Sequence, residues 1–312
     1  MMKPNIVFLL VDSLRADRFR SSLKTSKTPN IDNLIKEGTY FEQAISSASS
    51  TAQSIGTICT AMYPFKTGIT GKSYRDIKWN VKSYFDDFKK QGYSVYASAP
   101  EFAEKVGLKS NFKKTYQKHQ TAPMLWEGLG EDIIDLLESQ KMNEPWFLFL
   151  HILDLHYLIW LPEKFKKNEF GETPYDQMMS ALDVWVGKII EKINQKNTLL
   201  IITSDHGEYI PDIKNQNEKI KFQQGKMDKI LWKIGSKTPS SLMLFRNKAY
   251  SKFQKIRKKR QLSSLNINTL SPYQKRAFLG ARGEYEGELH VFDDLLKVPL
   301  LFHGMNIPKE KI

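Results

Sequence analysis

Three runs of apolar residues stand out along the chain, at positions 6–11, 146–153 and 198–203. They lack the apolar–polar alternation of a half-exposed strand, so we expect strands buried on both faces, as in a parallel sheet. Two shorter strands are expected at 94–97 and 298–302. Helical patterns lie between the strands, at 32–37, 131–138 and 178–193. This alternation predicts an α/β fold, a doubly wound and mostly parallel sheet with helices on both faces.

Polar residues fall where the three long strands end. The first run ends at Asp12, the second leads into Asp154 and His156, and the third is followed by Asp205 and His206. An Asp at such a place commonly caps a helix or forms a turn. Three such ends together favour a ligand site, because parallel strands deliver their carboxyl ends to one edge of the sheet. Carboxylate and imidazole groups suit a divalent metal, and we expect one or two ions of Mn, Zn, Mg or Ca.

The composition is that of a folded protein, with 41% hydrophobic and 26% charged residues in a chain of 312. The single cysteine, Cys59, excludes an internal disulfide framework and a multi-cysteine metal site. The chain contains no run of about 18 apolar residues, and its first apolar run has neither the basic start nor the cleavage site of a signal peptide. We therefore expect a cytoplasmic protein.

The net charge of +13 comes from one segment. Residues 211–283 hold 18 Lys and Arg against three acidic residues, whereas the remainder holds 29 against 31. Specific nucleic-acid binding is therefore not expected. Residues 226–234 and 242–260 have the pattern of basic amphipathic helices. Three readings compete: an arm that steers an anionic polymer or lipid headgroup to the site, a helix lying on an anionic membrane surface, and a solvated insertion with an ordinary packed face.

Short motifs at both ends of the chain occur in the order typical of a known family. They include Thr28-Pro29-Asn30-Ile31-Asp32, Thr60-Ala61-Met62-Tyr63-Pro64 and Thr203-Ser204-Asp205-His206-Gly207-Glu208. Others are residues 4–7 with 12–17, 37–41, 50–55, 67–69, 153–156, Tyr175 with Asp183, and 290–300. On these motifs the chain resembles the alkaline phosphatase superfamily, in its sulfatase-like branch.

The resemblance implies roles for individual residues. It makes Asp12, Asp205 and His206 metal ligands and places the family's nucleophile at Thr51, which also binds the metal. It makes His156 and His290, with Asp154, candidates to bind the substrate or a second metal. We give His119, His151 and His303 no functional role.

Two departures bear on the chemistry. A formylglycine-dependent sulfatase would have Cys or Ser at position 51, followed by Pro and Arg, but residues 52–55 are Ala-Gln-Ser-Ile. Such an enzyme usually has a second Asp after Asp12, and this chain has Ser13. An unmodified Thr51 instead resembles the phosphodiesterase, phosphoethanolamine transferase and phosphoglycerol transferase members. Ser49 and Ser50 are nearby competitors for the nucleophile.

The leading hypothesis is a metal-dependent hydrolase or transferase of phosphoesters that works through a phospho-Thr51 intermediate. One alternative is a sulfuric ester hydrolase with the same site, and another is a weakly catalytic relative that binds an anionic glycan or lipid. We expect one α/β domain over 1–312, with a basic insertion at 210–283. The C-terminal subdomain of relatives is missing, so the chain is either a short member or incomplete.

Overall fold

The computed structural model describes most of the chain. The described residues are 3–69, 83–99, 113–114, 124–156, 159–210, 213–214, 219–220, 271–280 and 291–312. The chain divides into two compact units, of which the first comprises residues 1–208 and 289–312 and the second residues 209–288. The limits of the second unit lie close to the predicted insertion at 210–283.

The first unit is built on one sheet of eight strands in the order β10-β2-β9-β6-β1-β5-β3-β4. Its strands are β1 (Asn5–Val11), β2 (Thr39–Phe41), β3 (Ser94–Ser98), β4 (Lys113–Lys114), β5 (Trp146–Ile152), β6 (Thr198–Thr203), β9 (Leu300–His303) and β10 (Glu310–Lys311). β1 pairs in parallel with both β5 and β6, and β3 pairs in parallel with β5. β9 runs antiparallel to β6 and β2. The predicted mostly parallel α/β sheet is confirmed, and each of the five expected strands is present.

The strands β1 and β5 are the most deeply buried. Every residue of β5 is buried, and so is every residue of β1 except Phe8, which is partly buried. Both faces of the sheet are covered by helices, which explains why these strands are continuous apolar runs rather than alternating ones.

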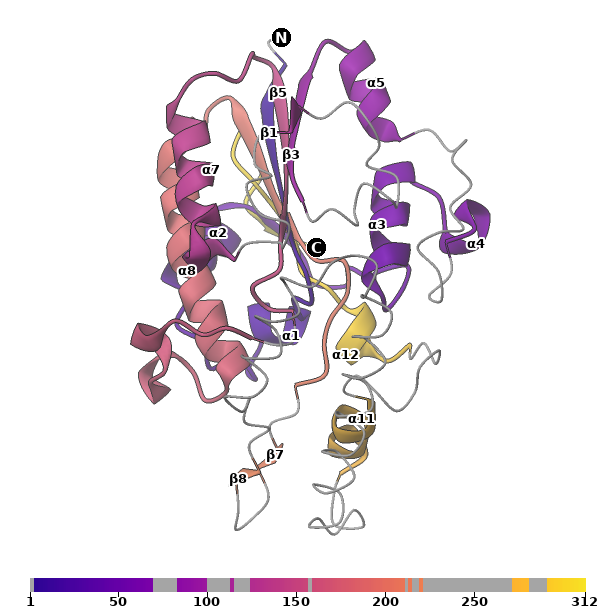
Figure 1. The fold of residues 1–312 in the computed structure, drawn as a ribbon, viewed down its shortest axis with the longest axis vertical. Helices are drawn as coiled ribbons and strands as arrows, with labels where there is room; N and C mark the ends of the chain where they lie inside the picture. Colours follow the sequence, from indigo (N-terminus) through magenta and orange to yellow (C-terminus); the bar gives the residue numbers. More distant parts are fainter. Residues whose placement is uncertain are drawn as a thin grey trace, which may run out of the picture. The chain divides into compact units, whose positions relative to one another are not determined.

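Helices cover the two faces of this sheet (Figure 1). On one face lie α2 (Pro29–Glu37), α7 (Leu129–Glu138) and α8 (Pro174–Lys192), and on the other α3 (Thr51–Thr60) and α5 (Tyr84–Lys90). Shorter helical segments are α1 (Ala16–Phe19), α4 (Pro64–Thr67), η1 (Leu125–Glu127), η2 (Glu163–Phe165), η3 (Asn168–Phe170) and α12 (Asp293–Leu296).

The packing of α3 matters for the site, because this helix begins with Thr51. Ile55 and Cys59 of α3 pack in one cluster with Leu10 of β1 and Phe149 of β5. Both α3 side chains are fully buried. At roughly 1.5–3 kcal/mol for each large buried apolar side chain, these contacts hold α3 firmly against the sheet. The start of the helix is therefore fixed relative to the strand ends.

The second unit is described only in part. It contains the antiparallel pair β7 (Ile213–Lys214) and β8 (Lys219–Ile220) and the helix α11 (Pro272–Gly280). The predicted helices at 226–234 and 242–260 lie outside the described residues. Across the described parts of the chain, no helix combines the length and the apolar character needed to cross a membrane.

Candidate active site

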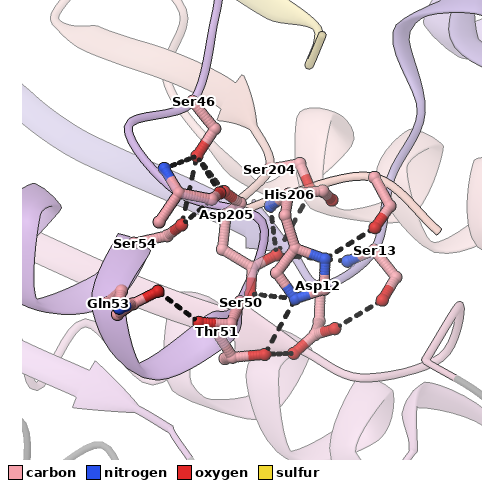
Figure 2. Close-up of polar contacts among 12 residues, drawn as sticks. Asp12, Ser13, Ser46, Ser50, Thr51, Gln53, Ser54, Ser204, Asp205 and His206 are labelled. Carbon is pink, nitrogen blue, oxygen red and sulfur yellow. Dashed lines mark hydrogen bonds and ion pairs between the residues drawn. The ribbon is translucent and has the colours of Figure 1, made fainter. Parts of the chain in front are cut away.

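The carboxyl ends of β1 and β6 and the start of α3 bring four predicted site residues together. Asp12 directly follows β1, and Asp205 and His206 follow β6 after one intervening serine. β1 and β6 are parallel neighbours, so their ends lie side by side. Figure 2 shows the side chains of Asp12, Thr51 and His206 turned toward one another.

The Thr51 hydroxyl lies between a carboxylate and an imidazole. Its Oγ1 is 3.0 Å from Nε2 of His206 and 3.3 Å from Oδ2 of Asp12 (Figure 2). Nδ1 of His206 is 2.6 Å from the carbonyl oxygen of Gly207. Because a carbonyl oxygen only accepts, Nδ1 carries a proton, and in the neutral imidazole the Nε2 lone pair faces Thr51. This nitrogen is thus available to a metal ion.

The neighbouring hydroxyl of Ser50 has a different partner. Ser50 is the residue before the first turn of α3, and its Oγ donates a hydrogen bond of 2.9 Å to Oε1 of Gln53. Thr51 is therefore the better placed of the two to act as a nucleophile next to Asp12 and His206.

The two carboxylate oxygens of Asp205 have different surroundings. Oδ1 accepts hydrogen bonds from the N–H groups of His206 (2.9 Å) and Ser13 (3.1 Å). Oδ2 is buried and accepts no hydrogen bond from any described residue, although it lies 3.4 Å from Nε2 of His206. A buried carboxylate oxygen is costly unless a donor or a cation satisfies it, so Oδ2 is a candidate metal ligand.

Ser13 holds both carboxylates in place. Its φ of 65° lies in the left-handed region, which non-glycine residues seldom adopt. In this conformation the Ser13 N–H reaches Asp205, while its Oγ donates a hydrogen bond of 2.8 Å to Oδ1 of Asp12. The bond leaves Oδ2 of Asp12 facing Thr51. The sequence departure at position 13 thus supplies a hydroxyl donor where a sulfatase-like pattern would supply a third carboxylate.

A second network, centred on Arg15, ties the site-bearing loops together. The buried guanidinium group donates to Oδ1 of Asp294 (3.0 Å) and to the carbonyl oxygen of Glu208 (3.1 Å). The Arg15 N–H donates to the hydroxyl of Tyr175 (2.9 Å), which in turn donates to the carbonyl oxygen of Ser13 (2.8 Å). The segments after β1 and β6 and the start of α12 are thus held in one arrangement.

Three pairwise distances in the site match the spacing of neighbouring ligands on one divalent ion. Neighbouring ligands of an ion with bonds of about 2.1 Å are about 3.0 Å apart in octahedral and about 3.4 Å apart in tetrahedral geometry. The contacts of Thr51 with His206, Thr51 with Asp12, and His206 with Asp205 measure 3.0, 3.3 and 3.4 Å. One ligand atom of Asp12 also lies within 4.8 Å of one of Asp205. The charge of two buried carboxylates this close together must be offset by a proton or a cation.

The electrostatics of the site reflect the two carboxylates. Burial raises the pKa of Asp205, and the charge of Asp12 raises it further. Burial alone would also raise the pKa of Asp12, but contact with His151 and the charges of neighbouring imidazoles outweigh burial and lower it. Burial disfavours the cationic form of His206, yet the two carboxylates raise its pKa. In this arrangement protons on Asp205 and His206 offset the negative charge of the carboxylates, and a bound metal cation would offset it instead.

The structure adds one residue that we did not predict, His151. Asp12, His151 and Asp205 each offer one ligand atom, and these atoms lie within 4.8 Å of one another. His151 is the only non-apolar residue of β5, and it pairs with Leu10 of β1. Leu10 lies two residues before Asp12, so it points to the same face of the sheet. A lone histidine near the carboxyl end of an otherwise apolar strand is the signal that could have identified it.

The remaining predicted residues are Asp154, His156 and His290. Both carboxylate oxygens of Asp154 accept from the backbone N–H of Leu125 at 3.2 Å. Burial raises the pKa of Asp154 to about 7. His156 is partly buried in the turn after β5, and its charge contributes to the lowered pKa of Asp12. His290 lies outside the described residues.

Comparisons with known proteins find relatives of this chain among hydrolases. The chain is 36% identical to an arylsulfatase of Clostridium perfringens over 95 residues, which cover 30% of this chain and 19% of the arylsulfatase. The phosphonate monoester hydrolase of Agrobacterium radiobacter has a similar fold, with a TM-score of 0.62 and 14% identity over 99% of this chain and 70% of that one. A 2-O GAG sulfatase gives a TM-score of 0.59 with 14% identity, over 99% of this chain and 66% of that one.

The chain thus spans only about a fifth of the arylsulfatase that it matches. A model of the sulfatase family matches residues 4–265, which include Asp12, Thr51, Asp205 and His206. The chain therefore belongs to the sulfatase family.

Proposed function

We propose that this protein is a metal-dependent hydrolase or transferase of phosphoesters, with Thr51 as the nucleophile. The observation that carries the proposal is the position of Thr51 Oγ1, 3.0 Å from His206 Nε2 and 3.3 Å from Asp12 Oδ2. Both neighbours belong to the group of oxygen and nitrogen donors whose spacing suits one divalent ion.

The site residues have separable tasks in this reaction. Asp12, Thr51, Asp205 and His206 would hold an ion such as Mn or Zn, which lowers the pKa of the threonine hydroxyl and offsets charge on the phosphoryl oxygens. Ser13 fixes the Asp12 carboxylate, and the Gly207 carbonyl fixes the imidazole of His206. The N–H groups in the first turn of α3, which begins at Thr51, favour an anionic group beside the hydroxyl.

The chemical step is an in-line displacement at phosphorus. Thr51 Oγ1 loses its proton and forms a bond to phosphorus, while the bond from phosphorus to the leaving oxygen breaks and that oxygen takes up a proton. The product is a phosphoester of Thr51. Water then attacks the same phosphorus and restores the hydroxyl, or an acceptor alcohol does so, which makes the protein a transferase.

The residues around Thr51 favour a phosphoester over a sulfate ester. Threonine has no route to formylglycine, and the Pro and Arg expected after such a nucleophile are absent at positions 52–55. The alternative, a sulfuric ester hydrolase, is favoured by the likeness to the 2-O GAG sulfatase and by the match to the sulfatase family. A sulfate ester and a phosphoester of one leaving group should therefore be assayed side by side.

The partner that we propose is an anionic ester, carried by a glycan or a lipid headgroup. Residues 211–283 hold 18 basic and only three acidic residues, and this positive charge supports an anionic partner. If this segment binds anionic lipid, the protein is a peripheral protein of the cytoplasmic membrane surface. Binding to anionic lipid is tested by sedimentation with anionic vesicles at low and high salt. Absence of binding at low salt would exclude a membrane surface as the partner.

The proposed chemistry is tested with nitrophenyl substrates. Turnover of a phosphodiester, a phosphomonoester and a sulfate is compared in the presence of Mn or Zn, using wild type, Thr51→Ala and Thr51→Ser. We expect Thr51→Ala to lower phosphoester turnover by about 1000-fold or more, and Thr51→Ser to keep a measurable part of it. Full turnover by Thr51→Ala would refute the nucleophile, and full turnover after chelation would refute the metal.

A further inference from the structure

His151 occupies a place in the site that the proposed mechanism does not use. It lies on β5, and its side chain is completely buried. His151 approaches the carboxylates of Asp12 and Asp205 from the strand next to β1, whereas Thr51 approaches the carboxylate of Asp12 from α3. Because Leu10 packs with Ile55 of α3, the face of the sheet shared by Leu10, Asp12 and His151 is the α3 face.

The distance between His151 and Asp12 distinguishes two kinds of contact. Nε2 of His151 lies 3.4 Å from Oδ2 of Asp12. Hydrogen bonds between a nitrogen donor and an oxygen acceptor are normally 2.7–3.2 Å long. Two ligands on one ion with bonds of about 2.1 Å are about 3.0–3.4 Å apart. The observed distance is longer than a normal hydrogen bond and equals the spacing of two ligands on one cation.

Two other contacts in the site have similar lengths. Thr51 lies 3.3 Å from the same Oδ2, and Asp205 Oδ2 lies 3.4 Å from His206 Nε2. A ligand atom of His151 also lies within 4.8 Å of one of Asp205. Opposite ligands of an octahedral ion are about 4.2–4.4 Å apart, so one ion can contact His151 and both carboxylates after a small adjustment.

We infer that His151 is a further protein ligand of the metal ion, bound through Nε2 with the proton on Nδ1. This inference rests on the metal-dependent function proposed above. A ligand from β5 gives the ion two imidazoles and two carboxylates besides the Thr51 hydroxyl. Two imidazole ligands favour Zn over Mg, Ca and Mn, which suit oxygen ligands.

The test measures metal binding rather than turnover. Protein stripped with a chelator is titrated with Co²⁺, whose visible absorption reports the ligands, and the dissociation constant is obtained by competition with a chelating dye. The variants are His151→Phe, which keeps most of the buried volume, and His151→Gln, which keeps a polar group. Thermal unfolding of the stripped variants shows whether each one folds.

A matched control is available on the same sheet. His303 is a buried histidine of β9 that does not belong to the group of possible metal ligands formed by Asp12, His151 and Asp205. The variants His303→Phe and His303→Gln carry the same chemical changes at a strand position away from the ion. We expect them to bind Co²⁺ as wild type does.

We expect both His151 variants to raise the dissociation constant by about 100-fold or more, since lost second-shell contacts alone cost 10–100-fold. The Co²⁺ bands should shift to lower energy, because water or an amide oxygen is a weaker-field ligand than imidazole. Unchanged affinity and spectrum would overturn the inference. Weaker affinity with an unchanged spectrum would also overturn it, since His151 would then only position Asp12. Wild-type protein that binds no metal would overturn the proposed function itself.

Discussion

Replacing Asp205 by Asn should change stability in opposite directions with and without metal. The Asn oxygen can still accept from the N–H groups of Ser13 and His206, which bond to Oδ1 in wild type at 3.1 and 2.9 Å. The amide nitrogen replaces Oδ2, the buried oxygen without a hydrogen bond from the described residues. The variant therefore removes one buried negative charge and one metal ligand while leaving the backbone contacts in place.

The size of the effect follows from the distance between the two carboxylates. Ligand atoms of Asp12 and Asp205 lie within 4.8 Å of each other. Two unit charges at this distance repel by about 3 kcal/mol at an effective dielectric constant of about 20. Because the pKa of Asp205 is raised, proton uptake relieves part of this repulsion at low pH. We therefore expect the metal-free variant to unfold about 5 °C or more above metal-free wild type at pH 8.

Metal reverses the order. An ion at 1,000 times its dissociation constant adds about 4.1 kcal/mol to wild type, more than the repulsion of about 3 kcal/mol, and it adds little to a variant that has lost a ligand. The assay is thermal unfolding at pH 8, first in chelator and then with increasing Mn or Zn. Asp183→Asn is the control: Oδ2 of Asp183 accepts from the backbone N–H and the side-chain amide of Asn30 at 3.2 and 2.9 Å, and an amide nitrogen in its place should lower Tm equally in both conditions. A metal-free Asp205→Asn protein that is less stable than wild type and keeps the full metal-induced shift would refute the reasoning.

Two further variants probe groups around the site. Burial raises the pKa of Asp154 to about 7 from an ordinary value of 3.8, so its contribution to stability is present below about pH 4 and is lost as the pH rises to 7. The free energy of unfolding, measured with urea from pH 4 to 8, should therefore fall with pH in wild type but not in Asp154→Asn. The exposed Asp87→Asn should show the same fall as wild type. An equal fall in Asp154→Asn would contradict the raised pKa. Arg15→Met leaves Asp17, bonded at 2.8 and 2.7 Å, and Asp294 without their cation. We expect a loss of about 2–4 kcal/mol at pH 7 that shrinks at pH 3, because the lowered pKa of Asp17 stabilises only above its ordinary range; an equal loss at both pH values would exclude the ion pair as its cause.

The part of the candidate site that lies at strand ends could be predicted from the sequence. Asp12, Asp205 and His206 were identified because an apolar run followed by polar residues is visible in one sequence, and parallel strands bring such ends together. Thr51 was identified from the resemblance, and the structure places it at the first position of α3.

The contacts that position the side chains of His151 and Asp154 join segments that are distant along the chain. His151 stands inside an apolar run, and only its register opposite Leu10 shows that it shares a face with Asp12. The carboxylate of Asp154 follows a strand as Asp12 does, yet the backbone N–H of Leu125 holds it. Neither the register nor that contact can be read from local pattern, because both join residues that are far apart along the chain.

The short strands show the same limit. β2 has three residues and β10 has two, too few for a periodic pattern to emerge. Both complete the sheet beyond β9, whose antiparallel direction depends on the path of the chain between β6 and β9 rather than on its own residues.

The most direct test of the central claim is to trap the covalent intermediate. Metal-loaded protein is mixed with a nitrophenyl phosphoester, quenched in acid during the first turnover, digested and examined by mass spectrometry. We predict a phosphoryl group, with any ester substituent that it retains, on Thr51 in wild type and no modification in Thr51→Ala. Turnover without a modified Thr51, or a modification on Ser49 or Ser50 instead, would contradict the proposed nucleophile.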